Sequence, residues 1–373
     1  MSTGAVASPL RVLVAPDSFK GSLRAVDAAD TIAQHWNLIR PADLVTELPM
    51  ADGGEGTLDA FETAYPESTR MPITVTGPVG GRVSTYWLHV AREGDGGIGV
   101  VELASTSGIE LMTELDPLHA HTVGFGEAIA AALDHGVHEV VVAIGSSAST
   151  DAGAGMLTAL GATIRDEVGN PLPDGGIQLA GAFDVDLSRL RALPPRGVSV
   201  LTDVTNPLLG PRGAAAIFGP QKGATAHDIE VLERALAAFA RLTAADVERP
   251  GAGAAGGTGF GLALWGASLN AGSTEIANLL GASAMIENAD LVITGEGSFD
   301  AADHDGKAPS FLIALAKKLR VPAALIAGSI NGAVPDDVAA VALTDLAGSA
   351  DAAIARPRYW LGVATESLAR RYE

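Results

Sequence analysis

Short apolar runs alternate with amphipathic stretches along most of the chain, and this alternation predicts strands followed by helices. The run at 11–16 (RVLVAP) ends in Pro-Asp and is typical of a buried strand. The stretch at 26–36 has helical spacing. Towards the other end of the chain, an amphipathic helix at 308–319 lies between strand-like runs at 291–294 and 323–327. Strands that alternate with helices favour a mostly parallel sheet.

The middle of the chain has a different pattern. Runs between glycine turns at 73–76, 83–91 and 98–103 predict strands that are partly antiparallel, because the connections are too short for crossover helices. Thr225 and Asp228 form a capping-box-like start for a further amphipathic helix. The other elements predicted here are a helix at 122–135, a strand at 138–144, a helix that ends near 160 and a strand at 198–204.

These patterns predict two α/β domains. The first strand and the last strand–helix–strand unit both look like buried parallel pieces, whereas the shorter alternating strands fall between them. We therefore expect a discontinuous, Rossmann-like and mostly parallel domain built from both chain ends, 1–75 and 285–373. An inserted α/β domain with a mixed sheet, 76–284, would lie between these two segments of the sequence.

Composition narrows the classes of protein to consider. The net charge of −20 argues against a nucleic-acid partner or an anionic membrane surface. The absence of cysteine excludes disulfides and thiolate metal sites, and it fits a cytoplasmic location. We expect no signal peptide and no membrane span, because the chain starts without an apolar core region and has no uninterrupted apolar stretch of about 18 residues.

Lysine is rare, and its placement points to phosphate chemistry. Of five lysines, three sit beside glycine in turn-like segments: Lys20, Lys222 and Lys307. Such a lysine offers a point charge beside backbone N–H groups, which is what a phosphate needs. Nearby carboxylates could hold Mg²⁺, so the combination suggests phosphoryl transfer. For any one of the three, a solvated lysine at a loop tip is an equally good interpretation.

Polar clusters fall at the predicted strand ends or in nearby glycine turns, where an open parallel sheet binds its ligands. Any one of them could be a helix cap or a turn, and for Asp151 or Ser149 a cap is at least as good an interpretation as a site. Five clusters on one sheet are harder to explain as caps alone. They are 17–20 (DSFK), 52–57 (DGGEGT), 146–151 (SSASTD), 203–206 (DVTN) and 296–300 (EGSFD).

Motifs of other nucleotide-binding folds are absent or poorly placed. The chain has no G-x-x-x-x-G-K-[ST] segment, which argues against a P-loop fold. The segment 251–256 (GAGAAG) matches G-x-G-x-x-G, but it follows Glu248-Arg-Pro250 and not an apolar strand. We therefore expect no dinucleotide site there.

Longer strings of the sequence resemble the class I glycerate kinases, which phosphorylate D-glycerate with ATP. The similarity runs nearly end to end, and strings this long and in this order are specific. They are 15–22 (APDSFKGS), 49–57 (PMADGGEGT), 102–108 (ELASTSG), 203–208 (DVTNPL), 218–225 (FGPQKGAT), 294–297 (TGEG) and 306–309 (GKAP).

The resemblance implies two α/β domains with the active site in the cleft between them, ATP with Mg²⁺ as donor and 2-phosphoglycerate as product. Two departures matter: Ser298 stands where the family usually has arginine, and Ala302 stands where it has glutamine. The segment 145–151 (GSSASTD) also differs from the family's GGSATND. A kinase for another small hydroxy acid and a non-catalytic ligand-binding relic therefore remain alternatives, and the oligomeric state is left open.

Roles for individual residues follow from the resemblance. Asp203 is our first choice for the carboxylate that orients or deprotonates the substrate hydroxyl, and Asp151 is the second. We expect Asp151 and Asp300 to be Mg²⁺ ligands. The remaining expected contacts fall into a substrate group and an ATP or phosphate group: Asp17, Ser18, Lys20, Asp52, Glu55 and Asn206 for the substrate, and Lys222, Gly295, Glu296, Gly297 and Lys307 for ATP.

Overall fold

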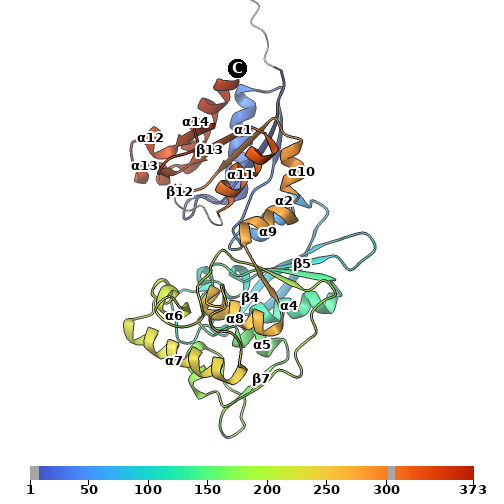
Figure 1. Cartoon of the computed structure of the whole chain (residues 1–373), viewed down its shortest axis with the longest axis vertical. Helices are drawn as coiled ribbons and strands as arrows, with labels where there is room; N and C mark the ends of the chain where they lie inside the picture. Colours follow the sequence, from blue (N-terminus) through green and yellow to red (C-terminus); the bar gives the residue numbers. More distant parts are fainter. Residues whose placement is uncertain (1–7, 301–306) are drawn as a thin grey trace, which may run out of the picture. The chain divides into compact units, whose positions relative to one another are not determined.

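The computed structural model describes residues 8–300 and 307–373, and it is an α/β protein throughout (Figure 1). Contacts between Cα atoms divide the chain into two compact units. Unit 1 contains the chain up to Asp52, the segment Asp59–Pro66 and the chain from Ser273 onward. Unit 2 contains Gly53–Leu58 and Glu67–Gly272. Each unit has its own sheet, which confirms the predicted fold class.

Unit 1 is built on a five-stranded sheet in the order β15-β13-β11-β1-β2, and every neighbouring pair is parallel. Its three inner strands, β13, β11 and β1, are buried and largely apolar, as expected where helices cover both faces of a sheet. β12 and β14 form a separate parallel pair. The strands are β1 (Arg11–Pro16), β2 (Leu44–Glu47), β11 (Leu291–Gly295), β12 (Ser298–Asp300), β13 (Ala323–Ala327), β14 (Ser329–Asn331) and β15 (Val338–Ala342).

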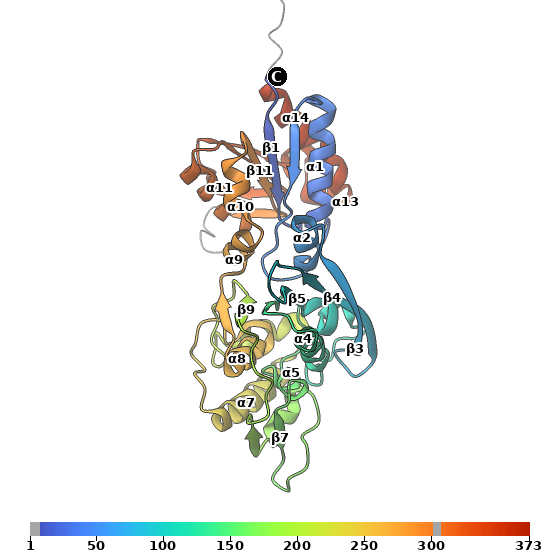
Figure 2. The same ribbon diagram turned by 90° about the vertical axis from the view of Figure 1, so that its right-hand side faces the viewer.

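Helices cover both faces of the sheet in unit 1. Figure 2 shows α1 and α14 on one side of it and α10 and α11 on the other. Trp36 of α1 and Leu361 of α14 are fully buried against the sheet. The helices are α1 (Ala25–Ile39), α10 (Ala282–Glu287), α11 (Ala308–Leu319), α12 (Leu343–Ala347), α13 (Ala350–Ala355), α14 (Pro357–Ala369) and the 3₁₀ helix η4 (Arg370–Tyr372).

Two helices fall where the chain passes between the units in sequence. They are α2 (Thr57–Ala64) and α9 (Gly272–Leu279). The segment 67–75, which we expected in the first domain, belongs to unit 2. The reason is that β3 (Thr69–Thr76) pairs along its whole length with β4 (Arg82–Val90).

Unit 2 is built on a six-stranded mixed sheet in the order β10-β9-β6-β5-β4-β3. The pairs β3–β4 and β4–β5 are antiparallel and the others are parallel, which confirms the predicted partly antiparallel run. β7 and β8 form a separate antiparallel pair. The remaining strands are β5 (Ile98–Glu102), β6 (Glu139–Ala143), β7 (Thr163–Arg165), β8 (Asp184–Asp186), β9 (Val198–Leu201) and β10 (Ser268–Asn270).

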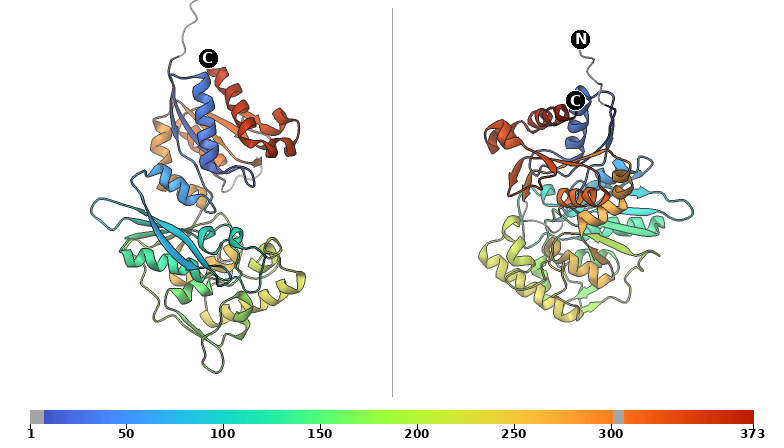
Figure 3. Two further views of the ribbon diagram at one scale, coloured as in Figure 1. Left: turned by 180° about the vertical axis from the view of Figure 1, so that it is seen from behind. Right: turned by 45° about the horizontal axis from the view of Figure 1, so that its top comes forward.

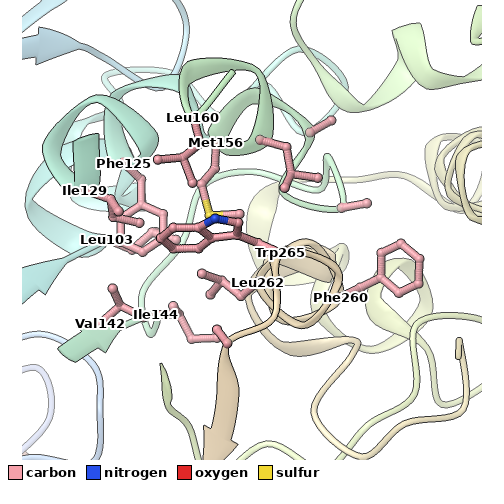
Figure 4. Packing of buried hydrophobic residues seen from close by; sticks show 14 of the residues in the cluster. Leu103, Phe125, Ile129, Val142, Ile144, Met156, Leu160, Phe260, Leu262 and Trp265 are labelled. Carbon is pink, nitrogen blue, oxygen red and sulfur yellow. The ribbon is translucent and has the colours of Figure 1, made fainter. Parts of the chain in front are cut away.

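The helices of unit 2 pack around an apolar core, seen from close by in Figure 4. Phe125 of α4, Met156 of α5 and Trp265 of α8 meet there, and the indole N–H of Trp265 donates to the carbonyl of Arg191 at 2.8 Å. The helices are α3 (Ala104–Ser107), α4 (Val123–His135), α5 (Ala154–Ala159), α6 (Ala214–Phe218), α7 (Ala226–Thr243), α8 (Ala254–Trp265) and the 3₁₀ helices η1 (Ile109–Leu111), η2 (Gly176–Gly181) and η3 (Pro220–Lys222).

The glycine-rich start of α8 explains the isolated G-x-G-x-x-G match. Ala255, Gly256 and Gly257 take left-handed backbone angles with φ of 52°, 67° and 88°. A Cβ atom on Gly256 would lie 2.0 Å from the carbonyl oxygen of Ser149, so only glycine fits. These glycines serve a close backbone contact inside unit 2.

The capping box at the start of α7 is formed as predicted. The Asp228 N–H donates to Thr225 Oγ1 at 3.2 Å, and the Thr225 N–H donates to Asp228 Oδ2 at 2.9 Å. Each side chain thus satisfies a backbone donor that the helix leaves without an internal partner.

We predict that Thr225→Ala lowers the free energy of unfolding of the protein by about 1 kcal/mol, the usual cost of losing an N-cap hydroxyl. Thr225→Ser is the matched control, because it keeps the hydroxyl and should stay close to the parent. Urea-unfolding midpoints followed by circular dichroism measure both. Equal losses in the two variants would contradict a capping role for the hydroxyl.

Candidate functional site

Three parallel strands of unit 1 end on the same side of the sheet, at their carboxyl ends, and an acidic residue comes after each of them. Asp17 comes directly after β1 and Glu296 directly after β11; the Asp17 N–H donates to the carbonyl of Gly295 at 2.8 Å. Beyond β2 the chain keeps running beside β1, since the Met50 N–H donates to the carbonyl of Pro16 at 2.8 Å, and this delivers Asp52.

β1 is the switch point of this sheet, because the chain adds strands on both sides of it. The chain goes from β1 outward to β2 on one side, and β11 returns on the other side of β1 (Figure 2). Figure 3 gives two further views of the same ribbon. In open parallel sheets, such a switch point leaves a crevice beyond the carboxyl ends of the strands. Unit 1 has a cavity of about 390 Å³ there, and its polar wall includes Asp17, Ser18, Lys20, Asp52, Glu296 and Lys307.

Two lysines therefore reach the cavity from different parts of the sequence. Lys20 Nζ lies 3.7 Å from Asp52 Oδ2, and Lys307 Nζ lies 3.8 Å from Glu296 Oε2. The Lys20–Asp52 pair is exposed, and a surface ion pair contributes at most about 1 kcal/mol. The ammonium group of Lys20 can therefore turn towards an anionic ligand at little cost, whereas the Lys307 pair involves the buried Glu296.

Crowding of the carboxylates perturbs Asp17. Burial raises the pKa of Asp17 to about 8, and the nearby carboxylates of Asp52 and then Glu296 act in the same direction. The Ser18 N–H, which donates to Asp17 Oδ1 at 2.6 Å, and the ammonium group of Lys20 oppose this shift. The cavity thus holds a carboxyl group that is largely protonated at neutral pH.

Two glycines at these strand ends are required because neighbouring backbone leaves no room for a side chain. A Cβ atom on Gly295 would lie 2.0 Å from the carbonyl oxygen of Ile326, and one on Gly328 would lie 2.2 Å from that of Gly297. Gly297 and Gly328 also line the cavity. The main chain therefore forms part of the cavity wall, which leaves backbone groups near any ligand.

In unit 2, Lys222 is a buried lysine. Its side chain is 2% exposed, and Nζ donates to Ser147 Oγ at 2.9 Å and to the carbonyl of Ser149. Burial lowers the pKa of Lys222 to about 7, while the negative charge of Asp151 opposes that shift. The contacts of Lys222 tie η3 to the loop that follows β6.

Asp151 has the geometry of a helix cap. Its carboxylate accepts hydrogen bonds from the N–H and Oγ1 of Thr122 at 2.9 and 2.8 Å, from the Gly153 N–H at 3.1 Å and from the Gly155 N–H at 3.3 Å. The side chain is 1% exposed. These contacts occupy its oxygens at the starts of α4 and α5, which favours the cap interpretation over metal ligation.

The other expected residues of unit 2 lie in more accessible places. Asp203 follows β9 and is half-buried, and its Oδ1 accepts from the Gly272 N–H at 2.8 Å. The Asn206 amide donates to the carbonyl of Arg212 at 2.8 Å. Glu55 is exposed.

Several residues at the cavity were not expected, and one expected residue is not part of its lining. Asp300 is at the end of β12 and does not line the cavity. Ser298, noted only as a departure from the family pattern, does line it, and its hydroxyl lies 3.1 Å from that of Ser329. Ala302 lies outside the described residues. The rest of the unexpected wall is mainly apolar and carries no motif: Leu343, Ala353, Ile354 and Pro357.

No helix in the described part of the chain is both long and apolar enough to cross a membrane.

Comparison with known proteins agrees with the resemblance read from the sequence. Residues 12–373 match the model of the glycerate kinase family. A glycerate kinase of Bacillus subtilis is 40% identical over 333 residues, 86% of each chain, and a glycerate 2-kinase of Escherichia coli is 40% identical over 344 residues, 89% of this chain and 87% of that one. A crystal structure from Salmonella typhimurium LT2, designated glycerate kinase 2, superposes with a TM-score of 0.81 at 37% identity and covers 98% of both chains. The chain therefore belongs to the glycerate kinase family, a family of phosphotransferase enzymes.

Proposed function

We propose that the protein transfers the γ-phosphoryl group of ATP to the 2-hydroxyl of D-glycerate and forms 2-phosphoglycerate. The observation that carries the proposal is the convergence of Lys20 and Lys307 on one cavity at the switch point of the parallel sheet. Both lysines lie within strings shared with the family whose members phosphorylate glycerate. A phosphate chain binds where positive side chains and backbone N–H groups line a crevice at the ends of parallel strands.

The carboxylates of the cavity fit a divalent cation. Asp17, Asp52 and Glu296 present hard oxygen donors to the same space, and their crowding is what a divalent charge relieves. Within the described residues no group of three side chains forms a ready-made metal cage. Mg²⁺ needs none, because it binds through one or two carboxylates together with substrate phosphates and water. Asp52 and Glu296 would hold the ion. The bound ion would neutralise negative charge on the phosphates of the nucleotide.

The chemistry requires the glycerate 2-hydroxyl to lie in line with the γ-phosphorus. We assign Asp203 to orient that hydroxyl and accept its proton as the new O–P bond forms and the bond to ADP breaks. Lys20 and Ser18 bind the substrate carboxylate or the transferring phosphoryl group, and Lys307 binds the phosphates of ATP. Lys222, fully buried in unit 2, holds the loop after β6 in position.

We predict Mg²⁺-dependent consumption of ATP with D-glycerate, with phosphorus attached to O2. Phosphorus–proton coupling in the NMR spectrum of the product identifies the carbon. Coupling to the C3 methylene would contradict the position, and turnover only with another small hydroxy acid in a substrate panel would contradict the substrate. No turnover with any acceptor would indicate a ligand-binding relic.

We predict opposite phenotypes for two aspartates of unit 2. Asp203→Asn keeps an acceptor oxygen for the Gly272 N–H, so the fold should persist while kcat falls by roughly 10²–10⁴, the range for a positioned acid–base group. Asp151→Asn places an amide N–H₂ among backbone donors, so it should lower the free energy of unfolding by about 1–3 kcal/mol.

Kinetics and thermal unfolding of both variants decide between these roles. If Asp203→Asn keeps kcat within a few-fold of the parent, Asp203 is not the base. If Asp151→Asn unfolds at the parent temperature, Asp151 is not a structural cap.

We also predict that the raised pKa of Asp17 makes the stability of the protein depend on pH. Because the pKa of Asp17 is raised from 3.8 to about 8, the folded protein binds a proton that the unfolded chain releases between those values. The contribution of Asp17 to stability is therefore complete below about pH 4 and is lost as the pH rises through 8. Asp17→Asn should gain stability relative to the parent as the pH is raised across this window.

Urea-unfolding midpoints at pH 5 and pH 8.5 measure this change. Asp336→Asn, at an exposed position of unit 1, is the control and should show a constant difference from the parent. A constant difference for Asp17→Asn as well would mean that burial and the neighbouring carboxylates do not raise the pKa of Asp17.

A further inference from the structure

The strand-end cavity of unit 1 has a second, apolar part. Part of its wall is formed by Leu343 of α12, Ala353 and Ile354 of α13 and Pro357 of α14. These residues follow the last strand, β15, and none belongs to the strings shared with the family. In the strand order of the sheet, β15 lies at one end, whereas β1 and β2, which precede Asp17 and Asp52, lie at the other.

Ile354 is the unusual member of this wall. Its side chain is 58% exposed, whereas Leu343 beside the same cavity is 2% exposed. A large aliphatic side chain that faces a cavity and is covered by so little protein is suited to contact an apolar ligand surface.

The wall is held in place by its own hydrogen bonds. Ser349 caps α13, with its hydroxyl accepting from the Ala352 N–H at 3.2 Å. The indole N–H of Trp360 donates to the carbonyl of Ala352 at 3.1 Å and so fastens α13 to α14. The Thr344 N–H donates to the carbonyl of Gly328 at 3.0 Å, which joins α12 to the glycine edge of the cavity. The apolar wall is therefore preformed, so little ordering of the chain opposes binding.

Hydroxyl groups come from strand ends between β15 and β1: Ser329 follows β13 and Ser298 follows β11. Ser298, Ser329 and Thr344 all line the cavity, and the hydroxyls of Ser298 and Ser329 are 3.1 Å apart. Each hydroxyl can donate and accept, so this zone suits a ligand region with several polar atoms, such as a sugar or the edge of a heterocycle.

The volume of the cavity and the chemical character of its lining indicate which ligand it can hold. A cavity of about 390 Å³ is far larger than a three-carbon acid needs and falls in the range of about 300–1,000 Å³ that drug-sized ligands occupy. Along the strand order, Lys20 follows β1, Ser329 follows β13 and the apolar residues follow β15, which matches the order of phosphates, ribose and base in a nucleotide.

We infer that Leu343, Ala353, Ile354 and Pro357 form the subsite for the heterocyclic base of the nucleotide. The inference rests on the proposed function, because it requires that a nucleotide is a substrate. It places the nucleotide along the cavity, with its base on α12–α14 and its phosphates towards Lys20 and Lys307.

Calorimetric titration of the whole protein with two probes tests the inference: ADP with Mg²⁺, and tripolyphosphate with Mg²⁺, which lacks a base. Ile354→Ser removes the apolar contact. It should raise the Kd of ADP about 10-fold and leave the Kd of tripolyphosphate within about two-fold. Leu346→Ser is the matched control, since Leu346 is an exposed leucine of α12 that does not line the cavity, and it should leave both constants unchanged.

The subsite is overturned if Ile354→Ser leaves ADP binding unchanged or weakens both probes equally. Failure of the proposed function is a separate result. If the parent phosphorylates D-glycerate with ATP while Ile354→Ser binds ADP normally, the function stands and the subsite is wrong. If the parent shows no phosphoryl transfer while Ile354→Ser selectively loses ADP binding, the subsite stands and the kinase function is wrong.

Discussion

Parallel pairing of β1 with β11 is the constraint on which the site of unit 1 depends. The register aligns Val12 with Leu291 and Pro16 with Gly295, so strands separated by most of the chain end together. Asp17 and Glu296, the residues that follow, then emerge side by side. Because β2 lies on the other side of β1, Asp52 reaches the same edge. The register of β1 against β11 thus sets the positions of the Asp17 and Glu296 carboxylates. The turns next to these residues place the lysines at the same cavity.

Most of the fold could be predicted from the sequence where hydrophobic periodicity was clear. The strands β1 and β13 and the helix α11 have the predicted limits, and the α7 capping box forms as its spacing indicates. The helix α8 could not be predicted, since three successive left-handed residues, Ala255 to Gly257, make its start look like a turn. Only the tertiary contact with Ser149 shows why glycine is required there.

The polar half of the candidate site could also be predicted, because parallel strands place the residues after them at one edge. Asp17 and Glu296 were found by this rule, whereas β2 was not predicted and Asp52 was singled out by its glycine-rich turn and by the family resemblance. The burial of Lys222 could not be predicted, since lysine is almost never fully buried and its position beside glycine suggests an exposed turn. Ile354 and the rest of the apolar wall carry no local signal, because their role comes from how α12–α14 return to the sheet edge. The expected cleft between the domains stays a prediction.

Three strand ends of unit 1 bring a buried carboxyl group, that of Asp17, and two further carboxylates into one ligand site. Carbon-13 NMR titration of the Asp17 carboxyl group measures this directly in the folded protein. The structure predicts a pKa of about 8, falling when Mg²⁺ and ADP are added, because a divalent cation stabilises the ionised form. A pKa near the ordinary value of 3.8 that does not respond to Mg²⁺ and ADP would contradict the account.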